Sequence, residues 1–195
     1  SWSMRYKHLQ MTKSADEVFD HITSLIPNGT FTGQHGEDIH LVITGGEPLL
    51  GWQRVWPDLI DRLNKEYGLV NVTFETNGSK HCEDNMTEYF NGEGKGVHIT
   101  WSTSPKLSIS AETREDTLKP DALVSMNKVE NSFLYNKFVV RDIIDFDEVD
   151  EYVSAYKEAG VTVDAVYCMP EGATFEQQAL TEKDVAEACM QTGYK

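Results

Sequence analysis

The feature of this 195-residue sequence that most constrains its fold is an alternation of short β-branched or apolar runs with amphipathic stretches. Apolar residues recur every three or four positions in a helix, and every second position or continuously in a strand. Parallel strands need a crossover between them, and the crossover is usually a helix. We therefore predict an α/β fold with a mainly parallel sheet, in the form of a partial (β/α) barrel, as one domain over residues 1–195. The predicted strands lie near 39–43, 70–74, 97–101, 134–140 and 163–168, and the predicted helices near 14–26, 52–68, 145–160 and 181–193.

Local signals mark several helix ends. Ser14 and Glu17 have the Ser-x-x-Glu spacing of a capping box, in which side chain and backbone groups satisfy each other at a helix start. Asp145 and Glu148 have the corresponding spacing before a helix that Gly160 closes. These pairs predict where two of the helices begin.

The charge balance excludes some classes of partner. Acidic residues outnumber basic ones by 32 to 17, which gives a formal net charge of −15. Such a field repels phosphate backbones and anionic membrane surfaces, so we expect no direct nucleic-acid partner and no membrane partner. No apolar run approaches the roughly 20 residues of a membrane span, and the first residues lack the apolar stretch of a secretory signal. The sequence predicts a cytoplasmic protein.

The cysteines and histidines form no recognisable metal motif. Cys82, Cys168 and Cys189 are too widely spaced for a disulfide framework or a close-spaced ligand pair, and Cys189 falls on the apolar stripe of the last helix. The six histidines lack a His-Glu-x-x-His spacing. We therefore assign no metal ligand and no catalytic residue within this chain.

Polar residues follow the predicted strands at the point where each strand ends. These segments are Thr-Gly-Gly-Glu-Pro at 44–48, Glu-Thr-Asn-Gly at 75–78, Ser-Thr-Ser-Pro-Lys at 102–106 and Cys-Met-Pro-Glu-Gly at 168–172. Ligands of parallel α/β folds bind at the carboxyl ends of the strands. We expect the four segments to converge on one rim.

The first of these segments suits an amino-acid ligand. Gly45 and Gly46 let backbone groups approach a ligand with no side chain between, and Glu47 offers a carboxylate to an ammonium. The alternative is a tight strand-to-helix turn, in which glycine only permits a positive φ and Pro48 starts the next segment. Taken alone, the segment does not decide between the two.

The next two segments have the same ambiguity. Glu75 and Asn77 could face the rim and bind a heterocycle or an ammonium, although Asn-Gly is also a common turn. Ser104 and Lys106 flank the rigid Pro105 and could bind a carboxylate or a ribose, although an isolated lysine is usually only solvated.

Together the strand-end segments resemble the 7-carboxy-7-deazaguanine synthase family of radical S-adenosylmethionine (SAM) enzymes. The motif at 44–48 occurs in many radical SAM enzymes, whereas 75–78 followed by Trp-Ser-Thr-Ser-Pro-Lys-Leu at 101–107 is similar to this family in particular. The segments 136–140 and 169–172 extend the resemblance over nearly the whole chain.

The resemblance implies a reaction, its cofactors and its partners. Reductive cleavage of SAM at a [4Fe-4S] cluster would give a radical that takes hydrogen from 6-carboxy-5,6,7,8-tetrahydropterin. Ring contraction assisted by Mg²⁺, with loss of ammonia, would then give 7-carboxy-7-deazaguanine for queuosine or other 7-deazapurine biosynthesis. The resemblance also implies an electron donor such as flavodoxin or ferredoxin, and it is compatible with a homodimer.

The resemblance also implies roles for individual residues. Thr44 and Glu75 would contact the pterin substrate. The cofactor SAM would be bound by Gly45, Gly46, Glu47, Asn77, Ser104, Pro105 and Lys106, with Cys168, Met169, Pro170 and Glu171 along its adenosine side.

The sequence departs from the family pattern at both ends. The family holds its cluster with a Cys-x-x-x-Cys-x-x-Cys motif, or a longer variant, followed by an Asp-Thr whose Thr binds Mg²⁺, all upstream of a Ser/Thr-Trp pair. Here Ser1-Trp2 is the first pair, so we expect a chain that lacks the N-terminal cluster loop and the C-terminal tail. As written, the chain should not be catalytic. Two alternatives stay open: another radical SAM enzyme, such as an activase, and a cluster-free homologue that binds SAM without redox chemistry.

Overall fold

A five-stranded parallel sheet forms the centre of the molecule. The computed structural model describes residues 13–195, so the predictions that concern Ser1-Trp2 lie outside the described residues. The strands follow one another across the sheet in chain order, and every neighbouring pair is parallel. All five predicted strands are present, most of them ending two residues later than predicted. They are β1 His40–Ile43, β2 Asn71–Thr76, β3 His98–Thr103, β4 Ser132–Val140 and β5 Ala165–Pro170.

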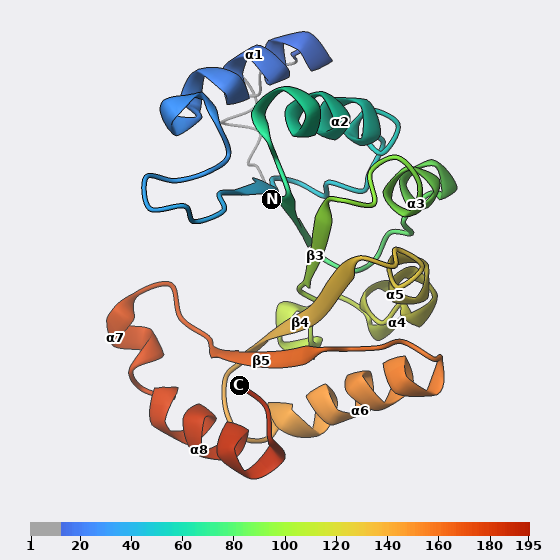
Figure 1. The fold of residues 1–195 in the computed structure, drawn as a ribbon. Helices are drawn as coiled ribbons and strands as arrows, with labels where there is room; N and C mark the ends of the chain where they lie inside the picture. The colour runs from blue at the N-terminus through green and yellow to red at the C-terminus, as the bar shows by residue number, and fades with distance from the viewer. Residues whose placement is uncertain (1–12) are drawn as a thin grey trace.

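Helices connect the strands and lie along the outer side of the sheet, from α1 and α2 at one edge to α6 and α8 at the other (Figure 1). This arrangement is the α/β class with a parallel sheet that the alternation predicts. Strands β1 and β5 are the two edges of the sheet within residues 13–195, so closure into a barrel is not seen there. The helices are α1 Ala15–Leu25, α2 Trp56–Tyr67, α3 Asp84–Asn91, α4 Arg114–Thr117, α5 Pro120–Met126, α6 Asp145–Glu158, α7 Phe175–Gln178 and α8 Glu182–Thr192.

The core lies between the sheet and these helices. Phe74, Trp101 and Leu134 are neighbours on β2, β3 and β4, and all three are fully buried. The rings of Phe74 and Trp101 stack with their centroids 5.1 Å apart. Successive side chains of a strand point to opposite faces. The next residues, Glu75 and Ser102, therefore face away from the helices.

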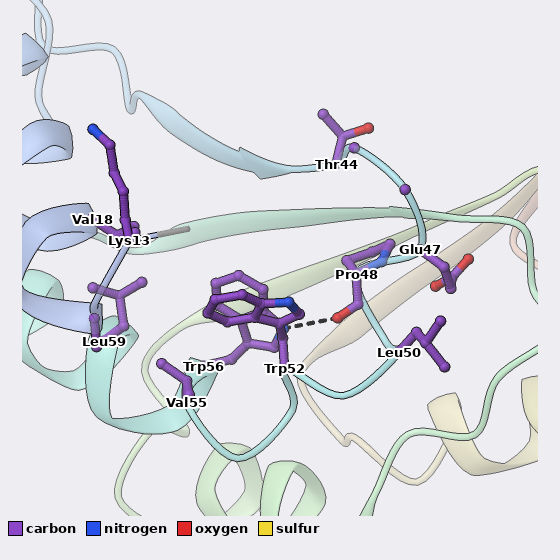
Figure 2. A pocket seen from close by; sticks show the side chains of 13 residues that line it. Lys13, Val18, Thr44, Glu47, Pro48, Leu50, Trp52, Val55, Trp56 and Leu59 are labelled. Atoms are coloured by element: carbon purple, nitrogen blue, oxygen red, sulfur yellow. Dashed lines mark hydrogen bonds between the residues drawn. The ribbon is translucent and has the colours of Figure 1, made fainter. Parts of the chain in front are cut away.

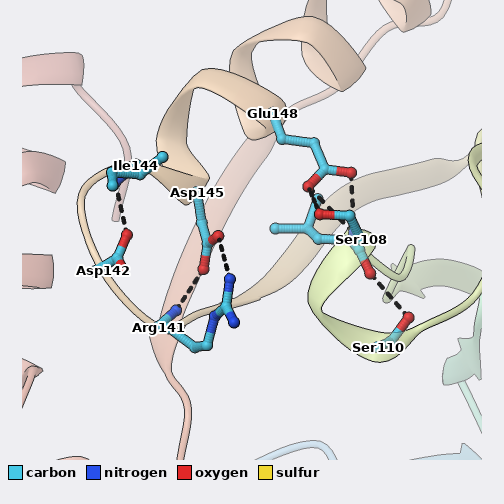
Figure 3. A network of polar contacts seen from close by, with 8 residues as sticks. Ser108, Ser110, Arg141, Asp142, Ile144, Asp145 and Glu148 are labelled. Atoms are coloured by element: carbon cyan, nitrogen blue, oxygen red, sulfur yellow. Dashed lines mark hydrogen bonds and ion pairs between the residues drawn. The ribbon is translucent and has the colours of Figure 1, made fainter.

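The structure confirms one predicted capping box and corrects the other. Ser14 accepts from the backbone of Glu17, and the Glu17 carboxylate accepts from the backbone of Ser14, as predicted. Helix α6 begins at Asp145, as predicted, but the capping box of Asp145 and Glu148 is wrong, because Ile144 is the N-cap and no side chain caps this helix start. Asp145 accepts from the backbone of Arg141, while Glu148 binds a different loop (Figure 3).

The last helix ends as predicted. Helix α8 begins after Thr181 and ends at Gly193, whose φ of 79° is the left-handed conformation that glycine adopts at helix ends. Its Cys189 is buried, as the apolar stripe predicts. None of the described helices has both the length and the apolar character needed to cross a lipid bilayer.

Candidate functional site

A polar cavity of about 440 Å³ lies at the carboxyl ends of β1 to β4. Residues from four different strands line it, as expected where parallel strands end at one edge of a sheet. Six of the residues predicted from the sequence meet here: Thr44, Gly46, Glu75, Asn77, Ser104 and Lys106. The remaining lining residues are Thr76, Ser102 and Lys137, to which the sequence analysis assigned no role.

The two glycines after β1 leave backbone open at the cavity. Gly45 has φ +85° and Gly46 has φ +59°, and no atom lies within 4 Å of where a Cβ would stand on either. The turn interpretation therefore holds for the backbone conformation. Gly46 also presents main-chain groups to this cavity without a covering side chain, and Gly45 lines the apolar cavity next to it, so the two interpretations are compatible.

The carboxylate of Glu47 is bound by the protein itself. Its Oε1 accepts from the Thr76 hydroxyl at 2.6 Å and from the backbone N–H of Leu49 at 3.1 Å, and its Oε2 accepts from the backbone N–H of Asn77 at 2.9 Å. Glu47 thus ties the segment after β1 to the segment after β2. A ligand ammonium would have to share this carboxylate with three internal donors.

Glu75 lies between two donors at the floor of the cavity. The ammonium of Lys137 on β4 donates to its Oε1 at 3.0 Å, and the hydroxyl of Thr44 donates to its Oε2 at 3.4 Å. A lysine within the largely apolar run of β4 was the sequence signal for this partner. The role of this lysine could be assigned only once the strand register placed Lys137 on the same face of the sheet as Glu75.

The loop that carries Ser104 and Lys106 is held at both ends. The backbone N–H of Ser104 donates to Thr76 at 2.8 Å, and the Tyr152 hydroxyl of α6 donates to the carbonyl of Lys106 at 3.2 Å. Just beyond, Glu148 accepts from the backbone N–H of Ser108 at 3.0 Å and from its hydroxyl at 2.8 Å (Figure 3). These contacts fix the backbone from which the Lys106 side chain extends. Within residues 13–195, Lys106 forms no ion pair.

A second, apolar cavity of about 470 Å³ shares Thr44 and Gly46 with the polar one. Pro48 forms one wall, and Trp52 and Trp56 form another (Figure 2). The two indole rings stack with centroids 6.0 Å apart, and the Trp56 Nε1 donates to the carbonyl of Pro48 at 3.0 Å. The sequence predicts a helix that begins near residue 52. Trp52 instead precedes α2 and is 42% exposed.

The remaining predicted residues are separated by the sheet. Pro105 and Glu171 line a smaller cavity of about 200 Å³ next to Ser104 and Lys106. Cys168 is buried on the helix-facing side of β5, where its thiol lies beside that of Cys189. The structure therefore brings Glu171 to the rim but not the side chain of Cys168. Met169 and Pro170 line neither this cavity nor the polar and apolar cavities described above.

The cysteines do not form a cluster site. The chain has three, Cys82, Cys168 and Cys189, and all are free, buried and located on different segments. Burial raises the pKa of Cys82 to about 11 and that of Cys168 to about 12, which disfavours the thiolate that binds iron. Among residues 13–195, no group of three His, Cys, Asp or Glu side chains could hold a metal ion. A [4Fe-4S] cluster and a carboxylate-bound Mg²⁺ therefore do not fit the described residues.

Comparison with known proteins gives one similarity of interest. No family model matches the chain. The sequence is 28% identical, over 211 aligned positions, to the 7-carboxy-7-deazaguanine synthase of Halobacterium salinarum (strain ATCC 29341 / DSM 671 / R1). The alignment covers all of this chain and 72% of that relative. The chain is thus similar over its whole length to a distant curated relative of that name, in agreement with the resemblance of its strand-end segments.

Proposed function

We propose that this chain forms the SAM-binding and pterin-binding face of a radical SAM 7-carboxy-7-deazaguanine synthase. The observation that carries the proposal is the convergence of Thr44, Gly46, Glu75, Asn77, Ser104 and Lys106 on one cavity. The similarity to the archaeal synthase supports it. The proposed partner is a small molecule, and the electron donor and the dimer remain predictions.

The residues present suit the two ends of SAM. The open backbone at Gly45 and Gly46 would accept the methionine end, whose ammonium and carboxylate need hydrogen-bonding groups at close range. The hydroxyl of Ser104 and the ammonium of Lys106 would bind the carboxylate or the ribose. Bound SAM would supply the group that removes hydrogen from the substrate. The protein's part is to hold both molecules side by side and to keep water away from them.

The proposed substrate lies at the floor of the same cavity. Thr44 and Glu75 would contact the pterin, whose ring carries N–H donors that a carboxylate accepts. A cluster would need thiolates from outside these 195 residues, because all three cysteines are buried and Cys82 lies on a different segment from the neighbouring thiols of Cys168 and Cys189. We therefore propose that these 195 residues bind both SAM and the pterin but do not catalyse the conversion by themselves.

The same cysteine arrangement favours a second candidate, a cluster-free protein that binds SAM without redox chemistry. Both candidates predict SAM binding, and only the synthase predicts conversion of the pterin. SAM binding is measured by isothermal titration calorimetry on the wild type and on Lys106→Met, with Lys157→Met on the outer face of α6 as the matched control. We expect Lys106→Met to weaken binding by roughly tenfold to a hundredfold, since a hydrogen bond to a charged group contributes about 1.5–3 kcal/mol.

Conversion is then assayed on the protein expressed with the in-frame coding sequence upstream of Ser1. The protein is reconstituted anaerobically with iron, sulfide, SAM and magnesium, and the product is identified by mass spectrometry. Formation of 7-carboxy-7-deazaguanine supports the synthase. SAM binding without any conversion supports the cluster-free candidate, and absence of SAM binding overturns both.

A further inference from the structure

An ion pair crosses the central strand at the floor of the polar cavity. Glu75 lies on β2 and Lys137 on β4, and β3 runs between them. Their charged groups nevertheless meet, at 3.0 Å between Lys137 Nζ and Glu75 Oε1. The residue of β3 in register with Glu75 is Ser102, on the same face of the sheet. Tyr135 of β4 is in register with Ser102, and Lys137 lies two residues further along on the same face, so the ion pair crosses β3 diagonally, on the carboxyl side of Ser102.

The hydroxyl of Ser102 lies in the same cavity as this ion pair. Ser102 is fully buried, and within residues 13–195 its Oγ has no hydrogen-bond partner although it belongs to the cavity lining. Buried polar groups are almost always hydrogen-bonded, and an unsatisfied one costs about 1–3 kcal/mol. The charged groups of the ion pair are only partly buried, with side-chain exposures of 22% for Lys137 and 41% for Glu75. Solvent screening leaves such a pair weak and easy to exchange.

We propose that the Glu75–Lys137 ion pair is a latch that the substrate exchanges for its own contacts. N–H donors of the ligand would take the place of Lys137 on Glu75. The released ammonium of Lys137 and the hydroxyl of Ser102 would then donate to an acceptor on the same ligand. Every charged or polar group in the latch has a partner after the exchange, including the hydroxyl that lacks one before it.

The latch selects for one kind of ligand edge. Its acceptor, Glu75, and its donors, Ser102 and Lys137, are on different strands about 4.8 Å or more apart. A 2-amino-4-oxo-pyrimidine ring presents two adjacent N–H donors and a carbonyl acceptor along a single edge, which matches this order. This step rests on the proposed function, because a pterin carries such an edge. In this proposal Lys137 and Ser102, in addition to Glu75, determine the specificity for the substrate.

The test measures equilibrium binding of 6-carboxypterin, an oxidised and unreactive analogue of the substrate. Binding is monitored through the intrinsic fluorescence of the pterin. The comparison ligand is 6-carboxylumazine, in which a carbonyl replaces the 2-amino group. The wild type should bind the pterin more tightly than the lumazine. The 2-carbonyl oxygen of the lumazine would face the Glu75 carboxylate, and two acceptors cannot form a hydrogen bond. Glu75→Gln should lose this preference, because an amide can both donate and accept.

Two variants probe the donor side of the latch. Lys137→Met should weaken binding of both ligands roughly tenfold or more, the range for a hydrogen bond from a charged group, and Lys137→Arg should restore part of it. Ser102→Ala should weaken binding several-fold but raise the Tm of the free protein, since it removes an unsatisfied buried group. A purely structural serine would not give these opposite signs. Lys157→Met, on the outer face of α6, should leave both affinities unchanged.

The possible outcomes distinguish failure of the latch from failure of the proposed function on which it rests. If the wild type prefers the pterin but Lys137→Met and Ser102→Ala bind as the wild type does, the latch is overturned and the proposed function stands. A lower Tm for Ser102→Ala also overturns the latch, because the hydroxyl would then have a partner in the free protein. If the wild type binds neither ligand, the proposed function fails and the latch fails with it.

Discussion

Glu47 shows how one residue can have a role in the fold where the sequence suggests a role in binding. Its carboxylate accepts from Thr76, Leu49 and Asn77 and thereby holds two strand-end segments together. A side chain that receives three hydrogen bonds has a fixed orientation. Its first effect on any ligand is therefore indirect, through the positions of Thr44 and Glu75 on the segments that it joins.

Replacing Glu47 with glutamine should destabilise the protein. The amide keeps one acceptor oxygen but turns its NH₂ group toward a backbone N–H, so at least one charge-assisted hydrogen bond is lost. Such bonds contribute about 1.5–3 kcal/mol, and we expect the free energy of unfolding to fall within that range. Urea unfolding of Glu47→Gln is compared with that of Glu88→Gln, where Glu88 is an exposed residue of α3 that forms no side-chain hydrogen bond to any residue of 13–195. Equal stability of the two variants would contradict this role.

At the scale of elements, the site depends on the connections that follow the strands. The connection between β1 and α2 needs two successive positive φ angles, at Gly45 and Gly46. The connection after β3 is fixed instead by side chains of α6, through Tyr152 and Glu148. One loop is shaped by glycine conformation and the other by packing against a helix that comes 40 residues later in the chain.

Gly46→Ala should strain the first connection. The left-handed conformation costs a residue with a Cβ roughly 1–2 kcal/mol, although the space around Gly46 is open. Gly96 has equally open surroundings but no positive φ, so Gly96→Ala serves as the matched control and should be neutral or slightly stabilising. Thermal unfolding measures both. A loss of stability in Gly96→Ala equal to that in Gly46→Ala would rule out backbone strain as the cause.

At the scale of the whole molecule, the charge distribution differs from the net charge. The chain carries a formal charge of −15, yet the polar cavity holds two lysines, Lys106 and Lys137, and one carboxylate, Glu75. An anionic ligand would meet a local excess of positive charge there despite the repulsive overall field. Raising the salt concentration would weaken this local attraction less than the long-range repulsion, because short distances are screened least.

The buried thiols give the protein a dependence on alkaline pH. Burial raises the pKa of Cys82 from 9.0 to about 11 and that of Cys168 from 9.0 to about 12. Below pH 9 these thiols are protonated in both the folded and the unfolded state. Above pH 9 the unfolded chain loses protons that the folded chain keeps, so the free energy of unfolding decreases as pH rises from 9 to 11. The Tm should fall over this range, and it should fall less steeply in Cys82→Ala. Equal slopes for the two proteins would contradict the assignment.

The elements of this fold could be predicted from the sequence because they depend on local periodicity. The five strands, the capping box at Ser14 and the helix end at Gly193 all follow from residues within one or two turns of each other. The short helices α3, α4, α5 and α7 were not predicted, since four to eight residues give too little periodicity. The helix start at Asp145 was predicted, but its capping box was predicted wrongly, because Glu148 binds Ser108, which lies 40 residues earlier in the chain.

The sequence by itself determined which strand ends carry polar groups, because strand position and residue type are local properties. Only the tertiary structure decided how those groups are used. It assigned the Glu47 carboxylate to internal donors, turned Cys168 toward α8, and brought Lys137 across β3 to Glu75, in the cavity that Ser102 also lines. The physical reason is register. Shifting a strand by one residue moves each side chain to the opposite face, and neither the face nor the neighbour is encoded within any one segment.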